Sequence, residues 1–291
     1  LDQLYNLRAK TASVLEENGI EVVYHHHEVG GPGQSEIEVK RHSLTKMADF
    51  TMKAKYIIKM VAHRQGKSAT FMPKPLYGEP GSGMHFHQHL FKKGKPLFYD
   101  AKNYGGLSRL AQHYVAGLLK HGQALLALTN PSTNSYKRLV PGYEAPVNLF
   151  YSVANRSAAI RIPKYANAPM EKRIEFRPPD ATGNVYLSMS AMLLAGMDGI
   201  KRKLDPTKEG FGPHDSNVFT WSDADRKKIQ PVPASLEEAL EALEKDHDFL
   251  LEGDVFSRGM LETWVKHKRE KECEKIRNRP HPYEMELYYD V

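Results

Sequence analysis

The stretch GSGMHFHQHL, residues 81–90, places His85, His87 and His89 at alternating positions directly after a glycine-rich turn. Because side chains alternate between the two faces of a strand, the three imidazoles are predicted to share one face. Three imidazoles on one face can belong to a metal site, to a phosphate site or to a solvated stripe. Further ligands elsewhere in the chain are needed to decide between these.

Two acidic residues flank a glycine-containing turn nearer the N-terminus. In HHHEVGGPGQSEIE, residues 25–38, Glu28 ends one predicted strand and Glu36 begins the next, so a hairpin could bring both carboxylates together. Neighbouring carboxylates repel each other, and a divalent cation would remove that repulsion. A polar hairpin with exposed acids is the alternative. The three histidines before Glu28 receive no predicted role.

Five arginines in predicted loops and strands form a third group, namely Arg138, Arg156, Arg161, Arg173 and Arg177. Arg161, Arg173 and Arg177 stand among apolar neighbours, where a charge is costly unless it meets an anion. Glu175 alternates with Arg173 and Arg177, so all three are predicted to share one face of a strand. This pattern is consistent with a structural ladder of ion pairs. It is equally consistent with a site in which arginines bind a metal-bound phosphate and a carboxylate substrate.

The segment NPSTNSYKRLVPGYEAP, residues 130–146, is rich in loop-forming residues and places Glu144 beyond a Pro-Gly turn. Such a loop can carry a carboxylate over a pocket as a lid, or it can be a simple turn. The spacing alone leaves both possibilities open.

The composition predicts an ordinary globular protein. The 291 residues are 41% hydrophobic and 26% charged, with a net charge of +6 and no long basic run, which favours anionic small ligands over nucleic acid. The single cysteine, Cys273, excludes an intrachain disulfide and favours a reducing, cytoplasmic compartment. The longest apolar run, residues 185–200, is too short to span a membrane and is predicted to be a buried helix.

Apolar periodicity and turn residues predict a mixture of helices and strands without βαβ regularity, which indicates the α+β class. Helices are predicted over residues 4–15, 44–64, 107–128, 185–200, 235–246 and 258–277. Strands are predicted over residues 20–28, 68–73, 85–89, 147–153, 158–163 and 172–180, with a further hairpin around Gly94. We expect residues 207–291 to form a mostly helical C-terminal subdomain.

Four motifs, taken together, resemble glutamine synthetase, specifically the bacterial type I form. They are GSGMHFH at residues 81–87, the segment 130–146, NRSAAIRIP at 155–163, and RPHPYEMELYYDV at 279–291. The resemblance covers the chain from about Ile20 to Val291, and the four motifs occur in the same order as in the family. It implies a curved antiparallel sheet with outer helices and a helical C-terminal region, within a catalytic domain that covers residues 1–291.

The resemblance also implies an activity. Members of this family make glutamine from glutamate, ammonium and ATP through γ-glutamyl phosphate, with two or more Mg²⁺ (or Mn²⁺) ions in each site. The intact enzyme forms a double-ring dodecamer. Type I enzymes carry an N-terminal β-grasp domain that this sequence lacks, so we expect the chain to be the C-terminal catalytic portion of a longer protein and its site to be incomplete alone.

The resemblance assigns roles residue by residue. It implies metal ligands at Glu28, Glu36, His85 and Glu175, and ATP contacts at His87, His89, Arg156, Arg161 and Arg173. It implies glutamate contacts at Gly81, Arg138, Glu144, Arg156 and Arg177, with Glu144 and Arg156 as the catalytic residues.

Departures from the family pattern leave alternatives open. Pro80 replaces an asparagine, Val23 stands where an acidic nucleotide contact is usual, and His89 replaces a serine. Phe219 aligns with a tyrosine that is adenylylated in some members, and it has no hydroxyl to modify. A γ-glutamyl-polyamine or γ-glutamyl-amine ligase, and a non-catalytic structural relative, are the alternatives to glutamine synthesis.

Overall fold

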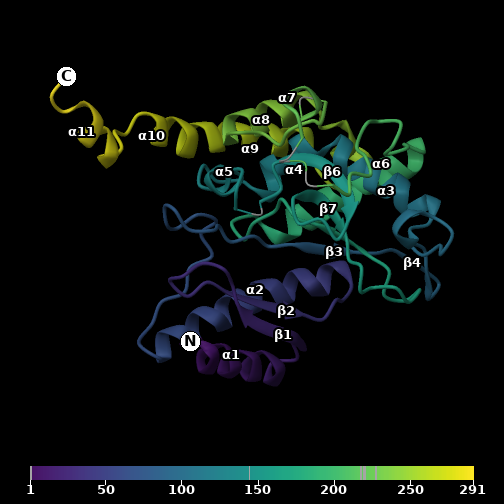
Figure 1. Ribbon diagram of the computed structural model, residues 1–291, viewed down its shortest axis with the longest axis horizontal. Coiled ribbons are helices and arrows are strands. Elements are labelled where there is room, and N and C mark those ends of the chain that lie inside the picture. Colours follow the sequence, from purple (N-terminus) through teal and green to yellow (C-terminus); the bar gives the residue numbers. More distant parts are fainter. Residues whose placement is uncertain (1, 144, 217, 219–220, 227) are drawn as a thin grey trace.

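The computed structural model describes residues 2–143, 145–216, 218, 221–226 and 228–291. Figure 1 shows two regions, an N-terminal lobe that contains α1, β1, β2 and α2, and a larger body formed by the rest of the chain. Among the described helices, none has both the length and the apolar character needed to cross a membrane.

The N-terminal lobe has a small core of its own. Its elements are α1 (Tyr5–Glu17), β1 (Val22–His27), β2 (Ser35–Val39) and α2 (Leu44–Arg64), with β1 and β2 paired as an antiparallel hairpin. Ile57 and Val61 lie one helical turn apart on α2 and are buried against Leu15 and Ile20. One face of the hairpin packs on these helices, which leaves the other face for the boundary with the body.

A four-stranded sheet forms the centre of the body, with the strand order β3-β8-β7-β6. The strands are β3 (Phe86–Gln88), β6 (Asn148–Val153), β7 (Ala158–Ile162) and β8 (Ile174–Phe176). The predicted α+β class is confirmed. The sheet is antiparallel at β3·β8 and β8·β7, as predicted, but β6 pairs with β7 in parallel. Both of these strands are buried on nearly all sides, so their apolar pattern lacks the alternation that marks an antiparallel strand.

The helices behind the sheet pack closely because glycines stand where they cross. The elements are α3 (Arg109–Lys120), α4 (Gly122–Thr129) and α6 (Val185–Arg202). A Cβ on Gly117 would lie 2.8 Å from the backbone nitrogen of Gly199, and a Cβ on Gly199 would lie 2.6 Å from that of Gly117. Only glycine at both positions allows α3 and α6 to approach this closely.

Helices continue to the end of the chain. They are α7 (Asp223–Arg226), α8 (Leu236–Lys245), η3 (Asp248–Asp254), α9 (Arg258–Lys268), η4 (Arg269–Cys273), α10 (Glu274–Arg277) and α11 (Pro282–Tyr288). Helix α8 has a side-chain cap, since Ser235 Oγ accepts from the Glu238 amide at 3.2 Å. Helices α8 and α9 share the core of the body, whereas α10 and α11 extend away from it (Figure 1).

The remaining elements are short, and one predicted strand is missing. They are β4 (Phe91–Lys92), β5 (Lys95–Pro96), η1 (Tyr104–Gly106) and α5 (Ser135–Arg138), with β4 and β5 forming the predicted hairpin at Gly94. Residues 68–73, predicted as a strand, are irregular. A strand needs a paired neighbour, and the Pro73 carbonyl instead accepts a hydrogen bond from the Ser82 amide at 2.7 Å, which closes a turn.

Candidate active site

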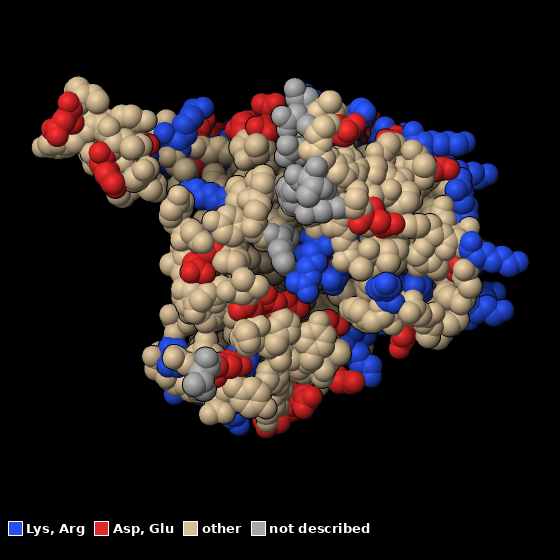
Figure 2. All heavy atoms as spheres, in the orientation of Figure 1, with Lys and Arg blue, Asp and Glu red and all other residues tan. Residues whose placement is uncertain are grey.

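The candidate site lies where the N-terminal lobe meets the sheet. Gln34, in the turn between β1 and β2, donates hydrogen bonds to the carbonyl oxygen of Gly81 at 3.0 Å and to Ser82 Oγ at 3.2 Å. These bonds hold the hairpin against the glycine-rich turn that leads into β3. Acidic and basic side chains lie next to one another along this boundary (Figure 2).

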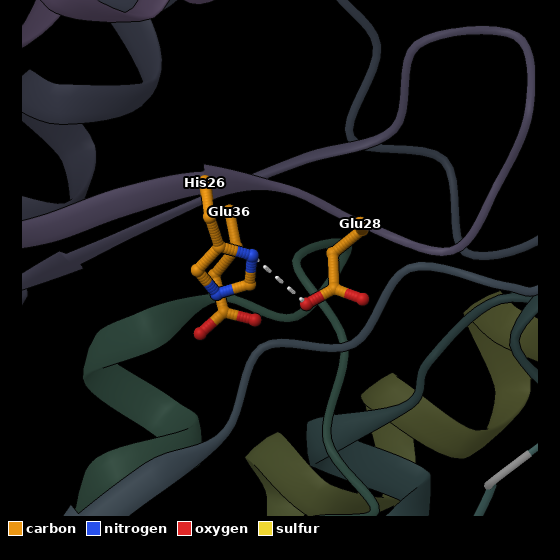
Figure 3. Close-up of side chains that lie close together, drawn as sticks. All are labelled: His26, Glu28 and Glu36. Atoms are coloured by element: carbon orange, nitrogen blue, oxygen red, sulfur yellow. Dashed lines mark ion pairs between the residues drawn. The ribbon is translucent and has the colours of Figure 1, made fainter. Parts of the chain in front are cut away.

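The hairpin brings Glu28 and Glu36 together, as its turn predicted, and adds His26. One ligand atom from each of the three side chains lies within 4.8 Å of the other two (Figure 3). Burial and the charge of Glu28 raise the pKa of Glu36. Two carboxylates and an imidazole form a donor set that suits a divalent cation, and a bound cation would remove the repulsion between the acids.

His26 is the member of this cluster that the sequence reasoning left without a role. It pairs with Glu36 across the hairpin, and its Nδ1 lies 3.5 Å from Oε1 of Glu28. A usable signal was present, because His26 and Glu28 are two residues apart and therefore share a face of an extended chain. The run of three histidines hid this signal, since the pattern alone does not say which of them faces the site.

Glu175 on β8 forms a second acidic centre, surrounded by bases. It is 1% exposed, and its carboxylate contacts Nδ1 of His85 at 3.1 Å, Nη1 of Arg177 at 2.8 Å and Nε of Arg161. The sequence predicted that Arg173, Glu175 and Arg177 alternate on one face, and the ion pair between Glu175 and Arg177 agrees with that alternation. The sequence pattern left open a structural ladder of ion pairs or a clamp for a metal-bound phosphate and a carboxylate substrate. The ion pairs of the ladder are present at Glu175, and the carboxylate and imidazole of this centre are also residue types that bind metals.

The protonation states at this centre follow from its neighbours. Burial alone would raise the pKa of Glu175, but the hydrogen bond to His85 and the charges of Arg177 and Arg161 hold it well below its usual range. The pKa of His85 is lowered to about 4, first by burial and then by the charge of Arg177. Metal ligands must be unprotonated, and an ionised carboxylate beside a neutral imidazole meets this requirement at neutral pH.

His87 and Arg173 lie next along the same strands. His87 is opposite Glu175 in the β3·β8 register, and Arg173 Nε donates to His87 Nδ1 at 3.2 Å. The pKa of His87 is lowered to about 4 by burial, which outweighs the raising effect of Glu175. Phe86, between the histidines, is buried in the core on the other side of the strand, as the alternation predicted.

The glycine-rich turn packs directly against Arg138. The Arg138 guanidinium is buried and donates to the carbonyl oxygens of Arg177 at 3.1 Å and Pro178 at 2.6 Å. A Cβ on Gly81 would lie 2.6 Å from both Arg138 Cγ and the Pro73 carbonyl oxygen. The structure thus brings Gly81 and Arg138 together, with this guanidinium turned toward the backbone.

The structure says less about the other predicted site residues. The carbonyl oxygen of Arg156 accepts a hydrogen bond from Arg177 Nε at 3.1 Å, which puts the Arg156 backbone beside the Glu175 centre. Val23 is 54% exposed on β1. Glu144 and Phe219 lie outside the described residues.

Comparison with known proteins identifies similar chains over nearly the whole length. The family described as glutamine synthetase, catalytic domain, matches residues 1–288. A glutamine synthetase of Frankia alni is 53% identical over 290 residues, and one of Streptomyces coelicolor is 51% identical over 291 residues. Each alignment covers 100% of this chain but only 60% and 61% of these two relatives, so the chain spans about three fifths of their length.

Solved structures agree with the sequence comparison. The cryo-EM structure of Plasmodium falciparum glutamine synthetase superposes with a TM-score of 0.86 at 35% sequence identity. The superposition covers 99% of this chain and 62% of the other.

Proposed function

Since this chain belongs to the glutamine synthetase catalytic-domain family, we propose that the protein carrying it joins ammonia to glutamate at the expense of ATP. The products are glutamine, ADP and phosphate. The observation that carries this proposal is the pair of centres at one boundary, an acidic cluster on the hairpin and an arginine-surrounded Glu175 on the sheet.

The two centres would divide the metal ions between them. Glu28 and Glu36, with His26, would hold a cation on the glutamate side, and His85 with Glu175 would hold a cation at the ATP phosphates. Divalent cations such as Mg²⁺ or Mn²⁺, when bound, neutralise the negative charge of the transferring phosphoryl group.

In the first step the γ-carboxylate of glutamate attacks the γ-phosphorus of ATP. A carboxylate oxygen–phosphorus bond forms, the bond to the β-phosphate oxygen breaks, and ADP leaves with that electron pair. Arg161 and Arg173, with Arg156, would bind the phosphate oxygens, and Arg138, Arg177 and the backbone at Gly81 would orient glutamate.

In the second step ammonia attacks the carbonyl carbon of γ-glutamyl phosphate and inorganic phosphate leaves. Ammonium must first give one proton to a base or to water, and the nitrogen loses a second proton to the departing phosphate as the amide forms. We propose that the Glu144 carboxylate closes over this ammonium site. Arg156 would stabilise the departing phosphate.

The test uses the natural-length protein that carries this chain. ADP release would be measured in Mg²⁺ with glutamate plus ammonium and, separately, with glutamate plus putrescine, and glutamine would be identified by mass spectrometry. We expect turnover with ammonium. Turnover with putrescine alone would replace the proposal with a γ-glutamyl-polyamine ligase, and no turnover with either amine would favour a structural role.

Two wider properties are proposed with it. We expect a homo-oligomer, and specifically the double-ring dodecamer, because the chain belongs to the glutamine synthetase family and the resemblance to that family implies this assembly. We also expect a cytoplasmic protein, which the single cysteine and the ATP-dependent chemistry support. Light scattering of the natural-length protein would measure the assembly directly.

A further inference from the structure

Arg156 lies in the turn that joins β6 to β7, and its side chain is exposed. An exposed arginine has many rotamers, so the backbone of its turn decides whether the guanidinium reaches the phosphate oxygens that the proposed function assigns to it. The turn begins at Ala154, which has a left-handed backbone conformation with φ at 64°. A residue with a Cβ keeps this conformation only where neighbouring groups hold it there.

The side chain of Asn155 holds this turn in two ways. Its Oδ1 accepts hydrogen bonds from the Ser157 amide at 3.0 Å and from Ser157 Oγ at 2.7 Å. Its Nδ2 donates to the carbonyl oxygens of Ser216 at 3.2 Å and His214 at 3.4 Å. One amide group therefore closes the turn around Arg156 and also ties it to a segment far along the chain.

The segment that accepts these bonds is itself anchored to the end of β6. The Asp215 carboxylate accepts from Ser152 Oγ at 2.6 Å and from the Val153 amide at 3.3 Å, and it also accepts from the Tyr104 hydroxyl. Burial would raise the pKa of Asp215, but these hydrogen bonds hold it below its usual range. Asn155 is therefore bonded to a segment that is fixed to the sheet.

The turn is held from β8 as well. Arg177 Nε donates to the Arg156 carbonyl at 3.1 Å, and Nη1 of the same guanidinium pairs with Glu175 at 2.8 Å. The position of the Arg156 backbone thus depends on the Glu175 centre and on Asn155 together. A shift of about 1 Å in a group that binds the reacting atoms can cost up to about two orders of magnitude in rate.

We propose that Asn155 is a positioning residue for the reaction, which fixes the turn 154–157 so that the Arg156 guanidinium meets the phosphate that is transferred and then released. This inference rests on the proposed function, because it takes Arg156 to bind that phosphate. Asn155 acts through Arg156, so its effect should vanish when the Arg156 side chain is removed.

The test is a double-mutant cycle in the natural-length protein, with Asn155→Ala, Arg156→Ala and the double variant. The rate kcat would be measured in Mg²⁺ at saturating glutamate, ammonium and ATP. In the wild-type background, Asn155→Ala should lower kcat about tenfold, the loss expected when about one transition-state hydrogen bond is forfeited. In the Arg156→Ala background, the same change should lower kcat by less than about twofold.

Binding of inorganic phosphate gives a readout that a purely structural role would not move. With Mg·ADP already bound, Asn155→Ala should weaken phosphate about tenfold by calorimetry, while Mg·ADP itself stays within about twofold. Asn18→Ala is the matched control, because the exposed Asn18 in the N-terminal lobe also donates a side-chain hydrogen bond, to the Val14 carbonyl at 2.9 Å. The control should leave kcat and both affinities within about twofold of the wild type.

A milder variant decides the matter if Asn155→Ala does not fold. Ser157→Ala removes the Oγ hydrogen bond to Asn155 and keeps the one from the Ser157 amide. It should lower kcat about threefold in the wild-type background and less than about twofold in Arg156→Ala.

The outcomes separate the inference from the proposed function. Equal losses of kcat in the two backgrounds, or unchanged phosphate binding in folded Asn155→Ala, would overturn the inference alone. An active enzyme in which Arg156→Ala turns over normally would overturn the role of Arg156 and the inference with it. No turnover in the wild type would overturn the proposed function.

Discussion

Glu36 on the hairpin and Glu175 on the sheet are the same residue type on two sides of one boundary, yet their pKa values shift in opposite directions. Burial and the nearby Glu28 raise the pKa of Glu36. His85 and two arginines lower the pKa of Glu175 despite its deeper burial. Burial raises the pKa of both carboxylates, and the neighbours decide whether that rise stands: Glu28 adds to it at Glu36, whereas the bases around Glu175 reverse it.

The difference also separates two kinds of site. In the described part of the chain, the hairpin cluster has two carboxylates and one basic partner, His26, so it gains from an added cation. The Glu175 centre has its counter-charges built into the protein and is stable as it stands. The lobe that carries the first cluster has a small core, whereas the sheet that carries the second belongs to the large one.

The largest expected effect is at Glu175. Glu175→Gln keeps the side-chain shape but leaves the buried Arg177 and the partly buried Arg161 without their anion. We expect the free energy of unfolding, measured in urea, to fall by about 3–5 kcal/mol. Glu252→Gln is the control, since it breaks the exposed pair with Lys201 and should cost less than about 1 kcal/mol. Equal losses in the two variants would contradict a built-in counter-charge at Glu175.

The next effect concerns the turn that the hairpin contacts. Gly81→Ala would push a Cβ against Arg138 Cγ and the Pro73 carbonyl, each at 2.6 Å, and should lower the free energy of unfolding by about 1–3 kcal/mol. Gly259→Ala in α9 has open space around it and should stabilise the protein by up to about 1 kcal/mol. If Gly81→Ala were as stable as the wild type, the close packing of this turn on Arg138 would be wrong.

A smaller effect tests the hairpin cluster. Because the pKa of Glu36 is raised, the stability it contributes is present at low pH and is lost as pH rises through that pKa. At pH 8 without divalent cations, Glu36→Gln should therefore have a higher free energy of unfolding in urea than the wild type.

With Mg²⁺ present, the wild type should become more stable than Glu36→Gln. Added Mg²⁺ should raise the melting temperature of the wild type and have little effect on Glu36→Gln. Glu16→Gln, at an exposed position on α1, is the control and should respond to Mg²⁺ as the wild type does. An equal response of Glu36→Gln would mean that the cation binds elsewhere.

The sequence could predict what depends on local pattern. The hairpin that joins Glu28 to Glu36 follows from a short turn between two strands, and the face shared by Glu175 and Arg177 follows from alternation. The long helices α2 and α6 follow from apolar periodicity. These features depend on neighbours within a few residues, so a single sequence contains them.

Features that depend on distant packing could not be predicted. The parallel pairing of β6 with β7 cannot be read from the sequence, because both strands are almost entirely buried and lack the alternation that distinguishes antiparallel strands. The pattern of residues 68–73 does not show that a turn replaces strand pairing there. The approach of Arg41 to Arg173 and His89 was missed because it depends on how the lobe packs on the sheet. Nothing near Arg41 in the sequence signals that approach.

The smallest expected effect is at His89, on the sheet side of the boundary. Its pKa is lowered to about 4 by burial and by the charges of Arg41 and Arg173, so the stability it contributes is complete above its ordinary value and is lost as pH falls toward 4. Between pH 7 and pH 4, His89→Gln should therefore lose less free energy of unfolding than the wild type. The difference should stay below about 1 kcal/mol, because partial exposure screens the charge. His63→Gln, at an exposed position on α2, shows what removal of a histidine away from the boundary does. A steeper acid loss in His89→Gln than in the wild type would contradict the expected sign, and with it the inference that a neutral His89 faces the positive charges of Arg41 and Arg173.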